Sequence, residues 1–198
     1  MPNTPDSRTG VILWDMAGTL LSSEEGTNKL CAMPGCEGAL GALQSDHTLI
    51  VATGDFAASA RLMLREVGLL EYFADIYGTL WAPVGKPYGE ILTEWAVPQE
   101  RCLAIGDRLN FDIPADCPRL VTVVVNQNGF TLHGDAIVEL VRVLAANGED
   151  YYSAFRNLMA KAKSHPHRWR DRDGLDFELT WHRHAALPEE RPVIVLPG

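Results

Sequence analysis

The sequence lacks the features that mark secreted and membrane-bound proteins. Its 198 residues include only four cysteines, and no two of them form a C-x-x-C pair of the kind found in zinc sites. No run approaches the roughly 18 consecutive apolar residues of a membrane span, and the first ten residues, MPNTPDSRTG, show no apolar segment typical of a signal peptide. We therefore expect a cytoplasmic protein without a membrane partner, whose cysteines are thiols.

Positive charge is also scarce in most of the chain. Residues 1–150 carry 9 Lys and Arg against 20 Asp and Glu, a net charge of −11, whereas residues 151–198 carry 8 against 6, a net charge of +2. An acidic body argues against non-specific binding to nucleic acid and is compatible with a metal site. The hydrophobic content of 46% suffices for one well-buried domain, so we expect a core over residues 1–150 and a C-terminal appendage over residues 151–198.

The strongest local pattern is VILWDMAGTL, residues 11–20. Its run of Val, Ile, Leu and Trp predicts a strand buried on both faces, and Gly18-Thr19 predicts the turn at which the chain leaves the sheet. Asp15 would then follow the carboxyl end of a buried strand, where open α/β sheets bind their ligands. This segment alone leaves open whether Asp15 is a nucleophile, a metal ligand or a helix-capping residue.

A second segment, LIVATGD at residues 49–55, repeats the pattern. Its buried strand ends at Thr53-Gly54, and Asp55 is placed to cap a helix that Gly68 ends. A strand, a hydroxyl-glycine turn and the amino end of a helix together favour the binding of an anion. The alternative is that Thr53 merely caps the helix.

Lys86 is the charged residue of a third segment. It follows a short strand predicted over residues 75–80 and lies on a glycine-flanked loop, and Pro87 fits the first turn of a helix over residues 87–95. A lysine in such a loop is ordinarily solvated. Its place at the start of a helix is the reason to consider a binding role.

A fourth segment, CLAIGD at residues 102–107, is another buried strand that ends in an acid. Asp112 follows five residues later, and an ordinary turn is the alternative for the Gly-Asp pair. A fifth strand over residues 121–125 and an amphipathic helix over residues 137–144 continue the alternation of strands and helices. This alternation predicts an α/β fold with a Rossmann-like, doubly wound parallel sheet.

The predicted topology brings the charged residues to one edge of the sheet. Right-handed crossovers place the carboxyl ends of parallel strands together, so Asp15, Thr53 and Asp107 would meet there with Lys86. Carboxylates this close repel one another, and a hard divalent cation with oxygen ligands, best Mg²⁺, would relieve the repulsion. A phosphoryl group there would also find an ammonium, a hydroxyl and backbone N–H groups, so that Asp15 could serve as its in-line nucleophile.

In combination, these segments resemble the motifs of a known superfamily. DMAGT at residues 15–19, Thr53-Gly54, Lys86-Pro87 and Gly106-Asp107 through Asp112 are similar, in the right order, to the four motifs of the haloacid dehalogenase-like (HAD) hydrolases. The resemblance covers residues 10–130 or so. It indicates a short-cap or capless member, because the cap insertion at residues 21–33 is minimal.

The resemblance implies a Mg²⁺-dependent phosphatase that forms an aspartyl-phosphate at its nucleophile and acts on a phosphorylated compound. It assigns metal binding to Asp15, Asp107 and the backbone carbonyl of Ala17, and it makes Asp112 either a further metal ligand or a partner of the ligands. It assigns catalysis to Asp15, Thr53 and Lys86, and it assigns binding of the phosphoryl group to Thr53, Gly54 and Lys86. The sequence leaves the identity of the substrate open.

Position 17 departs from the pattern of the superfamily. Its phosphatases usually carry, two residues after the nucleophile, an aspartate that acts as general acid and base, and this chain has Ala17 there. Without this general acid and base, the rate falls by a factor on the order of 10²–10⁴ where the leaving group needs a proton. The rate falls less for an anhydride or an acyl phosphate, whose leaving group is already stable. Alternatives are a catalytically poor pseudophosphatase that binds phosphate or a partner, and a phosphonatase-like C–P hydrolase, for which the insertion offers only Lys29 as the Schiff-base lysine.

The appendage falls outside the resemblance. Residues 151–163 have the apolar spacing of a helix, and the alternation over residues 175–183, with a second apolar run at residues 193–196, predicts a β-hairpin. We expect the appendage to pack beside the strand ends and limit which substrates enter. Trp169 and its neighbouring arginines suggest contact with nucleic acid, but the small positive charge argues against it.

The appendage also contains four histidines in two H-x-H pairs. Such pairs place both rings on one face of an extended segment, which is compatible with a metal site. The alternative, which the lack of a nearby cysteine or carboxylate at helpful spacing favours, is that the histidines are solvated. The four residues are His165, His167, His182 and His184.

Overall fold

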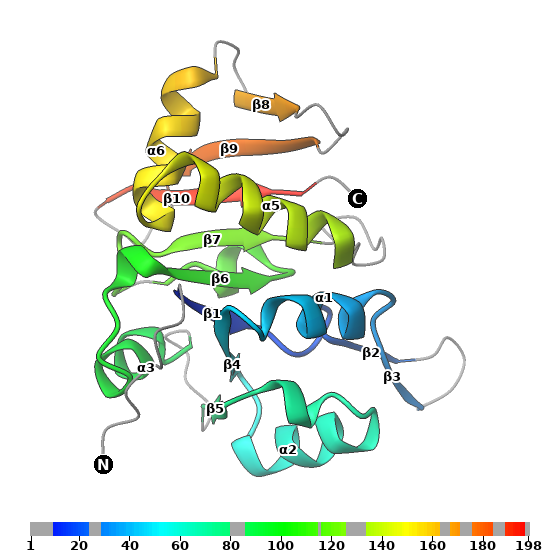
Figure 1. Ribbon diagram of the computed structural model, residues 1–198. Coiled ribbons are helices and arrows are strands. Elements are labelled where there is room, and N and C mark those ends of the chain that lie inside the picture. Colours follow the sequence, from blue (N-terminus) through cyan, green and yellow to red (C-terminus); the bar gives the residue numbers. More distant parts are fainter. Residues whose placement is uncertain are drawn as a thin grey trace.

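The predicted strands form the centre of one eight-stranded sheet in the computed structural model (Figure 1). The structure describes residues 10–23, 29–79, 86–114, 116–125, 134–162, 167–170, 176–183 and 189–196. The predicted α/β fold with a mostly parallel sheet is confirmed. In sheet order the strands are β5 (Asp75–Gly78), β4 (His47–Thr53), β1 (Gly10–Trp14), β6 (Cys102–Gly106), β7 (Val121–Val124), β10 (Arg191–Val195), β9 (Asp176–His182) and β8 (His167–Arg170).

β1 lies in the middle of the sheet because it is apolar on both faces. Val11 and Leu13 enter the core on one face, and Ile12 and Trp14 enter it on the other, all four being fully or almost fully buried. The strand pairs in parallel with β4 on one side and with β6 on the other. The residues that follow these three strands therefore lie at the same edge of the sheet, as predicted.

Helices cover both faces, as a doubly wound sheet requires. One face packs against α1 (Cys36–Leu43), α2 (Ala57–Glu66), α5 (Gly134–Asn147) and α6 (Tyr151–Lys161). The opposite face packs against α3 (Tyr88–Glu94), for which Pro87 is the N-cap. Three short elements complete this part: α4 (Leu109–Asp112) after β6, and the 3₁₀ turns η1 (Leu70–Tyr72) and η2 (Gln99–Arg101) before β5 and β6.

The described residues of the predicted cap insertion form a small hairpin. β2 (Leu21–Ser23) pairs antiparallel with β3 (Leu30–Ala32) to form a separate two-stranded sheet. In Figure 1 the pair extends away from the main sheet, beyond the carboxyl ends of its parallel strands. The boundaries predicted for the insertion and the appendage stay predictions.

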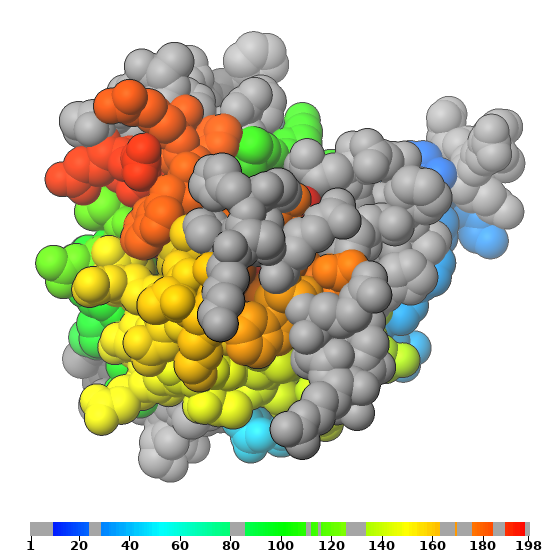
Figure 2. Space-filling model, turned by 90° about the horizontal axis from the view of Figure 1, so that it is seen from above, coloured from blue at the N-terminus to red at the C-terminus, as the bar shows by residue number. Residues whose placement is uncertain are grey.

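The described strands of the appendage continue the main sheet sideways. β9 and β10 form the predicted antiparallel hairpin, with Val193 opposite Thr180, but β10 also pairs in parallel with β7, with Val193 opposite Thr122. These strands thus extend the sheet beyond β7, with β10 next to β7, instead of lying beside the strand ends as the sequence analysis predicts. Figure 2 shows α6 next to β8 and β9 at this end of the molecule.

Trp181 fixes α6 against the added strands. Its ring meets Phe155 edge-on at a centroid distance of 5.0 Å and Tyr152 at 6.2 Å. Because such contacts add to the burial of large aromatic surface, they explain why the predicted helix docks on the hairpin.

Of the four histidines, His182 ends β9, whereas the side chains of the other three lie outside the described residues.

The cysteines are thiols, as the sequence predicts. All four cysteines are free in the structure. Among the residues that the structure describes, no helix combines the length and the apolar character needed to cross a bilayer.

His47 and Tyr151 form a buried polar pair at the amino edge of the sheet. The His47 Nε2 atom lies 2.6 Å from the Tyr151 hydroxyl, and Nδ1 lies 3.3 Å from the carbonyl oxygen of Leu43. A carbonyl oxygen only accepts, so Nδ1 donates to it and Nε2 accepts the tyrosine proton, an arrangement that needs a neutral ring. Burial lowers the pKa of His47, although the Leu43 carbonyl and the Asp46 charge oppose this shift.

We expect the free energy of unfolding to decrease as the pH falls below the ordinary histidine pKa of about 6.5. In that window the unfolded state binds a proton that the folded state does not yet bind, and the loss levels off below the lowered folded-state pKa. The substitution His47→Gln should flatten this part of a plot of urea midpoint against pH. Equal slopes for His47→Gln and wild type would contradict the prediction.

Candidate functional site

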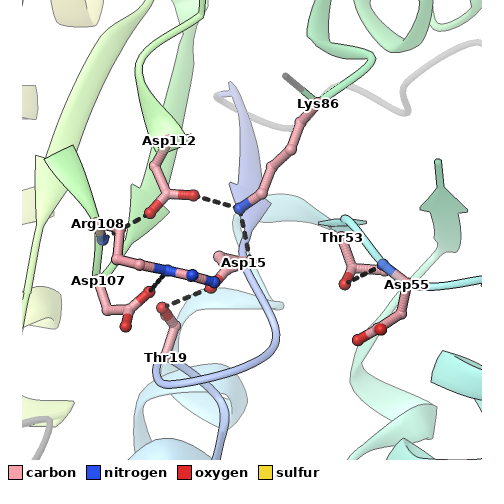
Figure 3. A network of polar contacts seen from close by, with 8 residues as sticks. All are labelled: Asp15, Thr19, Thr53, Asp55, Lys86, Asp107, Arg108 and Asp112. Carbon is pink, nitrogen blue, oxygen red and sulfur yellow. Dashed lines mark hydrogen bonds and ion pairs between the residues drawn. The ribbon is translucent and has the colours of Figure 1, made fainter. Parts of the chain in front are cut away.

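Asp15 follows β1 directly and is almost fully buried at the carboxyl edge of the sheet. Its backbone N–H donates to the Ile105 carbonyl oxygen at 2.8 Å and continues the pairing of β1 with β6. Its Oδ1 atom accepts a hydrogen bond from Lys86 Nζ at 2.6 Å, and its Oδ2 atom accepts one from Thr19 Oγ1 at 3.2 Å. Both carboxylate oxygens of Asp15 are therefore held in place by side chains (Figure 3).

Asp112 lies on the other side of the same ammonium group. Its Oδ1 atom contacts Lys86 Nζ, and its Oδ2 atom accepts the backbone N–H of Arg108 at 2.8 Å. The residue is 1% exposed. A side chain at Gly106 would overlap the Asp112 carboxyl group, so the glycine that ends β6 leaves the room this carboxylate occupies.

Asp107 completes an acidic cluster. One carboxylate oxygen each of Asp15, Asp107 and Asp112 lies within 4.8 Å of the others. Among the described residues, Asp107 Oδ1 is buried without a hydrogen-bond partner, and its ion pair is a long one, 3.6 Å to Nε of the exposed Arg108. Burial raises the pKa of Asp107, and the Asp15 and Asp112 charges raise it further.

The cluster has the composition of a site for a divalent metal ion. Two of the three carboxylates share one buried ammonium, and the third has only a long ion pair with Arg108, so the three acids outnumber the two cations beside them. An unpaired buried carboxylate oxygen is costly, and a hard cation with oxygen ligands removes that cost. Because Asp107 Oδ1 has no hydrogen bond, it is available as a ligand, and the three carboxylates could hold such an ion.

Lys86 remains charged despite its burial. Burial alone would lower its pKa, but Tyr88, Asp15 and Asp112 together raise the pKa above its ordinary value. Burial also lowers the tendency of Asp112 to ionise and so raises its pKa, an effect that the Lys86 charge opposes. The ammonium thus stabilises the Asp112 carboxylate, which burial would otherwise favour in its neutral form.

Thr53 lies at the end of β4 but is not part of this cluster. Its Oγ1 atom accepts the backbone N–H of Asp55 at 3.2 Å, and Figure 3 shows both residues on the far side of Asp15 from Asp107. The prediction that Asp55 caps the next helix is wrong, because the N-cap of α2 is Phe56, without a side-chain cap. The alternative that Thr53 caps the helix fails for the same reason, since its hydroxyl closes the turn.

Ala17 lies in the loop between Asp15 and the hairpin. It is exposed, and the loop around it is held by hydrogen bonds from Gly18 N–H to the Leu21 carbonyl at 2.8 Å and from Leu21 N–H to the Met16 carbonyl at 2.9 Å. The methyl group of Ala17 has no proton to donate, so this loop supplies no acid from that position.

Tyr88 and Thr19 are site residues that the sequence interpretation missed. Tyr88 is fully buried and lies close enough to Lys86 for each side chain to influence the pKa of the other. Its position two residues after Lys86, on the apolar face of a predicted helix, made it look like an ordinary core residue. Thr19 was assigned only to the turn, and no pattern in the sequence pointed to its bond with Asp15.

A separate cavity lies at the opposite, amino edge of the sheet. It has a volume of about 350 Å³ and lies between α1 and α5, with His47, Arg101 and Tyr151 among its lining residues. None of the acidic cluster lines it. The cavity is therefore distinct from the place where the charged side chains meet.

Comparisons with known proteins agree on one superfamily. Residues 24–115 match the model of a protein family described as a haloacid dehalogenase-like hydrolase. The match includes Thr53, Lys86, Asp107 and Asp112 and begins after Asp15. No curated protein matches the chain.

Solved structures with the same fold have low sequence identity to this chain. A HAD-superfamily hydrolase of subfamily IA, variant 1, from Geobacter sulfurreducens PCA is 14% identical with a TM-score of 0.55, over 66% of this chain and 98% of that one. A putative beta-phosphoglucomutase from Thermotoga maritima is 16% identical with a TM-score of 0.54, over 67% and 98%. A haloacid dehalogenase-like family protein from Streptococcus pneumoniae is 16% identical with a TM-score of 0.50, over 59% and 84%. The chain thus has a HAD-like fold.

Gly18 offers a test of how tightly the cluster is packed, with Gly68 as its control. Both have left-handed backbones, with φ of 82° and 77°, but only at Gly18 would a methyl group overlap Asp107 Oδ2, whereas nothing lies within 4 Å at Gly68. Gly68→Ala should lower the free energy of unfolding by about 1 kcal/mol, and Gly18→Ala by about 2–3 kcal/mol. Urea titration measures both, and equal losses would contradict the prediction.

Proposed function

We propose that this chain is a HAD-like hydrolase that removes a phosphoryl group from a phosphorylated compound through an aspartyl-phosphate at Asp15. The single observation that carries the proposal is the meeting of three carboxylates with one buried lysine at the carboxyl edge of a HAD-like sheet. The family match over residues 24–115 supports it, since it includes the lysine and two of the carboxylates.

Mg²⁺ is the metal that we propose for the acidic cluster. Asp15, Asp107 and Asp112 would hold it through carboxylate oxygens, and Ala17 through its backbone carbonyl. When bound, the ion supplies positive charge that orients the phosphoryl oxygens and offsets the charge developing on them. The Oδ1 atom of Asp107 supports this assignment, because it is buried without a hydrogen bond and its ion pair with Arg108 is long.

The side chains of the site carry out the nucleophilic attack and the binding of the phosphoryl oxygens. An Asp15 oxygen attacks phosphorus, and the bond from phosphorus to the leaving group breaks with its electron pair, which leaves the phosphoryl group on Asp15. Water then attacks phosphorus, so that phosphate departs and the carboxylate is restored. Lys86, already bonded to Asp15, would stabilise the phosphoryl oxygens together with the Thr53 hydroxyl and the Gly54 N–H group.

Ala17 determines which substrates fit this chemistry. A leaving group that needs a proton would receive none from this position. The leaving group of an acyl phosphate or an anhydride, by contrast, departs as a stable anion. We therefore propose that the enzyme prefers such activated phosphates to alkyl esters. The same residue favours a second candidate, a pseudophosphatase that binds metal and phosphate without appreciable turnover.

The first experiment tests Asp15 as the nucleophile. With Mg²⁺ and either acetyl phosphate or an aryl phosphate, Asp15→Asn should lower kcat/KM by about 10³-fold or more, because the amide is a poor nucleophile. Asp75→Asn, at a carboxylate paired with exposed Arg61, is the matched control and should keep wild-type activity. Turnover unaffected by Asp15→Asn would refute the enzyme proposal, and Mg²⁺ binding without turnover in the wild type would favour the pseudophosphatase.

The second experiment restores the missing acid. Ala17→Asp should raise kcat/KM for an alkyl phosphate by about 10²-fold or more, toward the range that general acid catalysis supplies. The rate with acetyl phosphate should change little, since its leaving group needs no proton. Ala17→Asn serves as the control of similar size. If the alkyl phosphate rate did not rise, the lack of an acid at this position would not be what limits the enzyme.

A further inference from the structure

Arg191 is a buried arginine with no role in the site as proposed. It is the first residue of β10 and is 2% exposed. Its Nε atom donates to the carbonyl oxygen of Pro114 at 3.2 Å, and its Nη1 atom donates to the carbonyl oxygen of Glu189 at 3.0 Å. Pro114 lies two residues after Asp112, so the guanidinium binds the backbone that carries one of the three carboxylates.

Apolar contacts join the same two segments. Ile113, the residue after Asp112, belongs to a small buried cluster with Val124 of β7 and Val193 of β10. Leu109, at the start of α4, and Val195 of β10 pack against this cluster. Leu109, before Asp112 in the sequence, and Ile113, after it, therefore pack on β7 and β10, the last two parallel strands of the sheet.

The segment that carries Asp112 has little support of its own. α4 has four residues, a single turn, which is too short to be stable without tertiary contacts. Within it, the Asp112 N–H donates to the Arg108 carbonyl at 2.9 Å, and the carboxylate is held by the Arg108 N–H and by Lys86. These bonds fix the carboxylate only while the backbone of residues 109–114 keeps its place.

We propose that β10 is a positioning element of the site and that Arg191 and Val193 hold residues 109–114 so that Asp112 faces Asp15 and Lys86. The inference rests on the proposed function, because it concerns the metal-binding carboxylates. It assigns the C-terminal segment a supporting role behind the acidic cluster. Among the described contacts, Arg191 reaches this segment through its hydrogen bond to the Pro114 carbonyl and touches none of the three carboxylates.

The test measures Mg²⁺ binding to the full chain by calorimetry, together with the Mg²⁺ dependence of acetyl phosphate hydrolysis. Arg191→Met removes the donor to Pro114 and should raise the dissociation constant for Mg²⁺ about tenfold, as the loss of outer-shell partners of metal ligands does. At saturating Mg²⁺ most of kcat should return. Arg191→Lys retains a donor, so its dissociation constant for Mg²⁺ should lie between those of wild type and Arg191→Met. Arg183→Met, which changes an exposed arginine next to the end of β9, is the matched control and should keep the wild-type dissociation constant.

A purely structural role for Arg191 predicts a different result. Arg191→Met would then lower the melting temperature but leave the Mg²⁺ dissociation constant unchanged at temperatures where the protein is folded, and this outcome would overturn the inference. Should Arg191→Met fail to fold, Val193→Ala tests the apolar half of the contact by the same titration and the same criterion. A wild-type chain that binds no Mg²⁺ would overturn the proposed function itself, whereas wild-type binding that neither variant alters would overturn this inference alone.

Discussion

The arrangement of the site depends on one ammonium group between two carboxylates. Lys86 forms ion pairs with Asp15, which follows β1, and with Asp112, which ends α4, and thus places one positive charge between two buried acids. Tyr88 supports the lysine from the first turn of α3. Three segments distant in the sequence are thereby fixed around one charge, and Asp107, which lacks such a partner, is the place where a metal ion would restore the balance.

Much of this arrangement follows from the sequence, because buried parallel strands have a simple signature. The apolar runs before Asp15, Thr53 and Asp107 predicted three central strands, and the rule that their carboxyl ends share an edge predicted where the acids meet. The position of Lys86 was less certain, since nothing local distinguishes a buried lysine from a solvated one. The phosphoryl-binding roles of Thr53 and Gly54 stay predictions.

Other features could not be predicted, because they depend on contacts between distant segments. Asp55 has the chemistry of a helix cap, but the chain passes through Phe56 before α2 begins, and the hydroxyl of Thr53 closes the turn instead. The alternation over residues 175–183 indicated a hairpin, but no local pattern could show that β10 would pair with β7 and extend the main sheet. A buried arginine such as Arg191 has no sequence signature, since its burial depends on a carbonyl group at Pro114.

The position of β10 also constrains the order in which the sheet can form. In the sequence β8 and β9 come first, but in the sheet they are joined to β7 only through β10. The parallel strands from β5 to β7 can assemble from contacts made earlier in the chain, whereas the far side of the sheet must wait until β10 is inserted. This insertion closes a loop of more than sixty residues from β7, a slow step for a folding chain. Folding would therefore end with β10, and α4 would reach its final support only at that step.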